Sequence, residues 1–185
     1  GYIYLECDIW SQTATVVAPN ATNMSWDGYY TPVGDVVIPD IIYHYEDWSG
    51  ALPCNVVDIS SGAFYLCEGM TSVTIPNSVT YIGPSSFEGC SSLSSITFGN
   101  NVTTIGASAF RGCSDLTSIT IPASVTNLPS ENPFEGCSNL MSITVSTDNT
   151  VYDSRNNCNA IIETSSNTLI TGCNNTIIPS SVTQI

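Results

Sequence analysis

The sequence predicts a repeat solenoid: coils of about 23 residues stack into a parallel β-sheet, mostly β-structure with short helical turns. Three observations predict it: columns of residues recur in one register, each coil holds an alternating strand, and prolines end these strands. Steps of 23, 23 and 24 residues separate the members of four columns. The columns are Phe64, Phe87, Phe110 and Phe134; Cys67, Cys90, Cys113 and Cys137; Met70, Leu93, Leu116 and Leu140; and Val73, Ile96, Ile119 and Ile143.

The strand of each coil is recognised by alternation of apolar and hydroxyl residues. In one coil Ile119 and Ile121 alternate with Ser118 and Thr120, which is the period of a half-buried strand. Pro122 then ends the strand because it lacks a backbone donor for the ladder. One coil cannot bury its apolar residues alone, whereas parallel stacking at about 4.8 Å per strand buries them all.

The recurring pattern LxxIxIPxxVTxIGxxAFxGC resembles the leucine-rich repeats of the BspA-like, or Treponema pallidum-type, family of bacterial surface proteins. The resemblance covers residues 59–145 and resumes at 176–185. It implies a right-handed leucine-rich-repeat coil. It also implies a non-enzymatic protein, secreted or held at the bacterial cell surface, that binds other proteins as adhesins do. The partner would be a host extracellular matrix protein or another bacterial surface protein. Family membership does not fix the ligand.

The remaining segments are interpreted as a cap and two insertions in one continuous structural domain. Residues 1–34 are expected to form an N-terminal β cap over the open core, and residues 35–185 the solenoid. Two pairs of apolar strands around polar turns predict hairpin insertions at about 41–58 and 158–172. The sequence stops partway through a coil at Ile185, so we expect a truncated or continuing array.

Composition narrows the class of partner. Sixteen Asp and Glu residues against two Lys and Arg residues give a net charge of −14, which would repel nucleic acid and anionic lipid. No apolar run approaches the roughly 18 residues of a membrane helix, so no direct membrane insertion is expected in this segment. We expect a monomer with a protein partner, and an export signal upstream of this chain.

The eight cysteines divide into two groups. The four of the repeat column are expected to be buried free thiols, because their Cβ atoms run side by side along a parallel stack. Cys7 and Cys54 lie outside the column and form a possible disulfide if the cap folds over the first hairpin. Cys158 and Cys173 flank the second hairpin and are another candidate pair. Either disulfide would support an oxidising, exported location.

No catalytic, cofactor-binding or metal-binding constellation is predicted. The chain has one histidine, His44, and no CxxC pair, so a zinc site is not expected. His44 has no neighbouring nucleophile motif and is interpreted as structural. Asp148, Asn149 and Asp153 lack the spacing of a calcium loop and are interpreted as a solvated turn.

Two surfaces remain as candidate binding sites. The first is the strand face that points away from the core, where threonine could merely favour strands or could build a polar platform for a protein partner. Its residues are Ser72, Thr74, Ser95, Thr97, Ser118, Thr120, Ser142 and Thr144.

The second candidate is the aromatic N-terminal region. Exposed Trp26 and Trp48 could stack on sugars, which would make the chain a glycan-binding module, while buried tryptophans would only seal the cap. A third possibility is a structural spacer beside a functional domain elsewhere.

Overall fold

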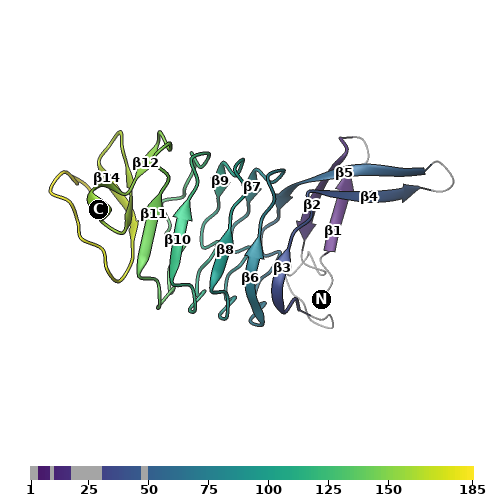
Figure 1. Cartoon of the computed structure of the whole chain (residues 1–185), viewed down its shortest axis with the longest axis horizontal. Helices are drawn as coiled ribbons and strands as arrows, with labels where there is room; N and C mark the ends of the chain where they lie inside the picture. Colours follow the sequence, from purple (N-terminus) through teal and green to yellow (C-terminus); the bar gives the residue numbers. More distant parts are fainter. Residues whose placement is uncertain (1–3, 9–10, 18–30, 47–49) are drawn as a thin grey trace.

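The computed structural model describes residues 4–8, 11–17, 31–46 and 50–185, with the backbone alone for residues 4, 7, 44–46, 50 and 51. Strands dominate this part of the chain, and its only helical element is a 3-10 helix, Arg155–Asn157. Figure 1 shows the strands following one another along an elongated stack.

Four sheets contain the strands. The largest is built from β1 (Tyr4–Asp8), β2 (Thr13–Val17), β4 (Ile41–Glu46), β5 (Gly50–Ile59), β7 (Tyr81–Ile82) and β9 (Thr104–Ile105). The second holds β3 (Gly34–Val37), β6 (Met70–Thr74) and β8 (Ser95–Thr97), and the third holds β10 (Ser118–Ile121) and β11 (Ser142–Val145). The fourth holds β12 (Tyr152–Asp153), β13 (Ala160–Glu163) and β14 (Thr168–Gly172).

Strands β3, β6, β8, β10 and β11 lie side by side along one side of the stack (Figure 1). β6 pairs in parallel with β3 and β8, and β10 pairs in parallel with β11. The register places Val73 beside Ile96, and Ile119 beside Ile143. Because these pairs are members of one sequence column, the spacing of the repeat sets the register of the strands.

A second side of the coils carries a shorter parallel ladder, β5-β7-β9. Here Ile59, Ile82 and Ile105 pair in register and are fully buried. At its N-terminal end the ladder continues to β2, which pairs in parallel with β5 and in antiparallel with β1. Ala14 and Val16 of β2 are buried in the common core, so this strand covers the first coil.

The third side of each coil is a tight turn around the phenylalanine column. The Cys90 N–H donates to the Phe87 carbonyl at 3.2 Å, and every coil of the column repeats this bond. The Gly89 N–H donates to the carbonyl of Arg111 in the next coil at 2.7 Å. Gly89 adopts a left-handed φ of +76°, which glycine tolerates without steric cost. The helical turns of the prediction are therefore single hydrogen-bonded turns.

Stacked aromatic rings fill the core behind these turns. Successive ring centroids of Phe64, Phe87, Phe110 and Phe134 lie 5.0, 5.1 and 5.7 Å apart, with interplanar angles of 10° or less. All four rings are buried. Offset or parallel ring contacts of this kind add about 0.5–1.5 kcal/mol each beyond area burial.

The four cysteines of the repeat column are buried free thiols, as predicted. Each of the last three donates from Sγ to a phenylalanine carbonyl in the preceding coil, for example Cys90 to Phe64 at 3.1 Å. Burial raises the pKa of Cys67 to about 12 and that of Cys137 to about 11. They therefore stay protonated at neutral pH and act as small apolar core residues.

Both predicted hairpin segments contain antiparallel strand pairs. β4 pairs with β5, and the pair extends away from the N-terminal end of the stack (Figure 1). β13 pairs with β14 near the other end. The division into a cap at 1–34 and a solenoid at 35–185 remains a prediction.

The C-terminal region is organised around an arginine. Arg155 makes a 2.6 Å ion pair with Asp153 and donates to Asn167 at 2.8 Å. Residues 176–185, which repeat the coil pattern in sequence, form no strand beyond a single bridge at Gln184. Ile177, in this segment, is 74% exposed.

Candidate functional site

The eight hydroxyl residues singled out in the sequence lie in two rows along β6, β8, β10 and β11, and together they are called the hydroxyl face. All point away from the core, whereas Val73, Ile119 and Ile143 between them are buried. Hydroxyls of Thr120 and Thr144 approach to 2.9 Å across neighbouring strands. The paired residues are Ser72 with Ser95, Thr74 with Thr97, Ser118 with Ser142, and Thr120 with Thr144.

Strand β3 places a carboxylate, not predicted from the sequence, at the border of this face. Asp35 lies in register with Ser72 and accepts hydrogen bonds from Ser72 Oγ at 2.7 Å and Thr71 Oγ1 at 3.1 Å. These bonds lower the pKa of Asp35. The signal was its position four residues before Pro39, the same spacing that separates Ser72 from its proline.

The hydroxyl face is uncharged although the protein is strongly acidic. Strands β6, β8, β10 and β11 contain no Asp, Glu, Lys or Arg, while the whole chain carries sixteen carboxylates. Asp35 borders the face at its N-terminal end. A partner can therefore approach these strands without meeting a row of like charges.

The ladder of this face is interrupted at one place. β8 pairs only with β6, and β10 pairs only with β11, so the two strands belong to different sheets. In the described part of the chain, no backbone hydrogen bond joins β8 to β10. The facing edges of two parallel strands thus remain without a ladder partner.

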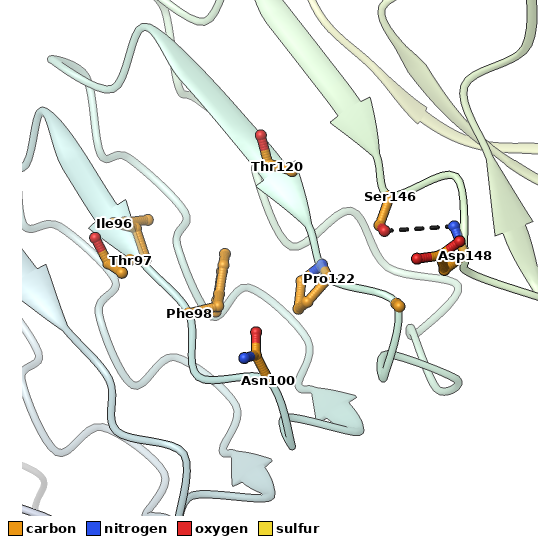
Figure 2. Close-up of a pocket in the computed structure, with 9 residues that line it drawn as sticks. Ile96, Thr97, Phe98, Asn100, Thr120, Pro122, Ser146 and Asp148 are labelled. Carbon is orange, nitrogen blue, oxygen red and sulfur yellow. Dashed lines mark hydrogen bonds between the residues drawn. The ribbon is translucent and has the colours of Figure 1, made fainter.

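A groove of about 510 Å³ lies at this interruption and is shown in Figure 2. Its floor includes Ile96 and Phe98, which are only partly buried although they belong to core columns. The Phe98 ring meets Phe110 edge-on, with centroids 5.9 Å apart. The rest of the lining is Thr97, Asn100, Thr120, Pro122, Ala123, Ser146 and Asp148. Two residues of the hydroxyl face, one on each side, therefore line the groove.

A glycine stands between Phe98 and Asn100, two residues that line the groove. Gly99 stands where the flanking coils have Pro76 and Pro122. A Cβ atom at Gly99 would lie 2.1 Å from the Pro76 carbonyl oxygen, so the backbone after β8 sits closer to the preceding coil than any other residue allows.

Other residues singled out in the sequence are not brought into this groove. Cys54 is disulfide-bonded and buried. The side chain of Cys7 lies outside the described residues, so its pairing with Cys54 stays a prediction. Cys158 and Cys173 are free thiols. Trp26, Trp48 and the side chain of His44 also lie outside the described residues.

The two arginines of the chain are both paired with carboxylates. Arg111 pairs with Glu135 at 3.2 Å and with Glu88 at 3.7 Å, and Arg155 pairs with Asp153. Burial alone would raise the pKa of Asp153, but the hydrogen bonds and charge of Arg155 outweigh it and leave that pKa lowered. Within the described residues no group of His, Cys, Asp and Glu side chains could hold a metal ion.

A family model described as a BspA-type leucine-rich-repeat region matches residues 57–185 in six copies. The chain belongs to this family. The resemblance seen in the sequence is therefore confirmed, and the fold is of the leucine-rich-repeat type. The described part of this BspA-type chain contains no helix of the length and hydropathy needed to cross a membrane.

Solved structures support the assignment. A leucine-rich repeat protein from Bacteroides capillosus is 28% identical, with a TM-score of 0.61 over 77% of this chain and 92% of that one. The Treponema pallidum leucine-rich repeat protein is 22% identical, with a TM-score of 0.52 over 77% of this chain and 68% of that one.

The pneumococcal vaccine antigen PcpA is 18% identical, with a TM-score of 0.55 over 86% of this chain and 51% of that one. This BspA-type chain thus spans about half the length of that antigen. At these identities, the T. pallidum protein and PcpA show the fold alone. No curated protein is a significant match.

Proposed function

We propose that this chain is a non-enzymatic, exported bacterial protein whose solenoid of right-handed coils binds another protein through the hydroxyl face. Membership of a repeat family of bacterial proteins supports the general class. The identity of the partner, attachment to host matrix and location at the cell surface all belong to the proposal.

One observation carries the proposal: an uncharged strip of hydroxyls on a protein of net charge −14. Within each of two sheets, β6 with β8 and β10 with β11, paired strands hold the hydroxyls in register over aliphatic side chains that are buried except at Ile96. A rigid surface loses little conformational entropy on binding, and hydroxyls can both donate and accept hydrogen bonds. Repeat proteins use extended surfaces of this kind for partners.

The disulfide at Cys54 supports export. Structural disulfides persist in oxidising compartments and are rare in the bacterial cytosol. Cys54 lies within β5, which joins the first hairpin to the stack. A thiol count under denaturing conditions tests this part: six free thiols support an oxidised, exported protein, whereas eight would contradict it.

The binding experiment is a screen of the purified chain against matrix proteins, mucins and a glycan array, with two triple variants. The test variant is Thr74→Arg, Thr97→Arg and Thr120→Arg, which places three long cations on the hydroxyl face. The control is Thr80→Arg, Thr103→Arg and Thr126→Arg, which adds the same charge at exposed threonines on another side of the same coils.

We expect the test variant to weaken binding of any captured protein by about tenfold or more, because it blocks contact and breaks the hydroxyl rows. The control variant should bind like the parent chain. Equal loss in both variants would mean that added charge, not the hydroxyl face, decides binding. Binding to glycans alone would contradict a protein partner.

A further inference from the structure

We propose that the groove at the junction of β8 and β10 binds a neutral sugar ring of a glycan, which stacks on Phe98 and hydrogen-bonds to polar side chains of the rim. This inference goes beyond the proposed function, because it gives the chain a second ligand of a different chemical class. Three features of the groove carry it: an aromatic floor, rim side chains that are available for hydrogen bonds, and the sign of its charge.

The first feature is the floor. Ile96 and Phe98 are only partly buried, although the residues of their columns in the two flanking coils are at most 4% exposed. Phe98 stands where those coils have Ile75 and Ile121, so this coil alone of the three presents a ring at the position. The negative face of an aromatic ring attracts the C–H groups on the apolar face of a sugar ring, and the contact removes apolar surface from water. The groove volume of about 510 Å³ is also within the usual range of small-ligand sites.

The second feature is the set of polar side chains around the ring. The backbone N–H of Asn100 donates to Asn77 Oδ1 at 2.8 Å, which fixes its backbone, whereas its exposed side-chain amide has no hydrogen-bond partner among the described residues. The exposed Thr97 hydroxyl has none there either. Figure 2 shows Asn100 and Thr120 on opposite sides of the Phe98 ring in this view. Amides and hydroxyls both donate and accept hydrogen bonds, as sugar hydroxyls require.

The third feature is charge. Asp148 is the only charged residue that lines the groove, and it is exposed at the rim (Figure 2). A carboxylate accepts strong, charge-assisted hydrogen bonds from hydroxyl groups. The same carboxylate, on a protein of net charge −14, repels a sugar that carries a carboxylate of its own. The lining contains no cationic side chain that would offset this repulsion, so a neutral sugar fits and a sialic or uronic acid does not.

The probe is an array of glycans that end in neutral hexoses or N-acetylhexosamines, printed beside their sialylated counterparts and screened with the intact chain. The neutral oligosaccharide that gives the strongest signal is then titrated by isothermal titration calorimetry. We expect its sialylated counterpart to bind at least about tenfold more weakly because of the charge repulsion. Equal binding of the two would contradict a neutral-sugar site beside Asp148.

The first variant tests stacking. Phe98→Ile restores the residue that the flanking coils have in this column, so it removes the ring and keeps the coil pattern. It should weaken the neutral oligosaccharide about tenfold. Tyr81→Ile is the matched control: it removes an exposed ring from β7, outside the groove, and should leave the affinity unchanged.

Two further variants test the rim. Asn100→Ala removes the amide and should weaken the neutral oligosaccharide about fivefold, whereas Asn127→Ala, at an exposed amide outside the groove, should not. Asp148→Asn should also weaken it about fivefold and should reduce the discrimination against the sialylated counterpart. Asp115→Asn, an exposed carboxylate outside the groove, is the charge control and should change neither property.

The outcomes distinguish this inference from the proposed function. If the screen captures a protein but the array binds no glycan, the proposed function stands and the groove does not bind a sugar. Glycan binding that survives in both Phe98→Ile and Asn100→Ala also overturns the groove site and places the sugar elsewhere on the chain. If a neutral glycan binds, is lost in these variants and no protein is captured, the groove site stands and the proposed function fails. Melting temperatures of all variants establish that each is folded.

Discussion

The turn side and the strand side of the same two coils differ in how they are joined. On the turn side the Phe87 N–H donates to the Ala109 carbonyl at 2.8 Å and the Gly89 N–H to the Arg111 carbonyl at 2.7 Å. On the strand side, between β8 and β10, no ladder forms. These two coils are therefore joined by backbone hydrogen bonds at their turns and not between their strands β8 and β10.

The two sides also differ in how regular they are along the stack. The turn side buries an unbroken column of rings and thiols, each coil contacting the next through bonds that repeat with the sequence. The strand side keeps a regular hydroxyl face but interrupts it where Gly99 replaces proline. A repeat protein can thus vary one side of a coil for a ligand while the other side maintains the register.

The largest effect is expected from truncating the ring column. Phe87→Ala removes a fully buried ring stacked on two neighbours and should lower the free energy of unfolding by about 3–5 kcal/mol. Phe98→Ala in the groove should cost only about 1–3 kcal/mol, because that ring is partly exposed and makes one edge-on ring contact. Urea unfolding of the two variants measures the difference, and equal costs would contradict the division between the two sides.

A smaller loss of stability is expected from substituting Gly99, whose backbone lies against the preceding coil. The Cβ of Gly99→Ala would meet Pro76 O at 2.1 Å and Pro76 C at 2.5 Å, both backbone atoms, so the coil must move. We expect this movement to lower the free energy of unfolding by about 1–3 kcal/mol. Asn100→Ala is the control for stability. Its backbone N–H still bonds to Asn77, so it should stay within about 0.5 kcal/mol of the parent chain.

Much of the strand register could be predicted because it follows from columns of residues. Once Val73, Ile96, Ile119 and Ile143 are aligned, parallel stacking places the hydroxyl residues between them on one outer face. The buried thiols follow from the same columns, since equivalent residues of a parallel stack point in the same direction. Each coil repeats the same local pattern, so aligning the repeats predicts the strand register from one coil to the next.

The groove could not be predicted, since it depends on a distance between coils. The sequence shows Gly99 in place of proline, but only the structure shows that this backbone lies against the Pro76 carbonyl. The C-terminal coil is a second example. TIIP repeats the coil pattern, yet Ile177 is exposed and no strand forms there. A local pattern does not specify whether a neighbouring strand is available to pair with it.

The smallest expected effect has the opposite sign and tests the turn side alone. Ser86 is fully buried in a column that has Ala63 and Ala109 in the adjacent coils, and its hydroxyl has no hydrogen-bond partner. Ser86→Ala should therefore raise the free energy of unfolding by about 1 kcal/mol, because an unpaired buried hydroxyl is removed while the packing is kept. Ser114→Ala is the matched control: its hydroxyl donates to the Ser91 carbonyl at 3.1 Å, so its loss should lower the free energy of unfolding by about 1 kcal/mol. If urea unfolding shows that Ser86→Ala is also less stable than the parent chain, the Ser86 hydroxyl has a hydrogen-bond partner in solution. That result would contradict the prediction that this buried hydroxyl is unpaired.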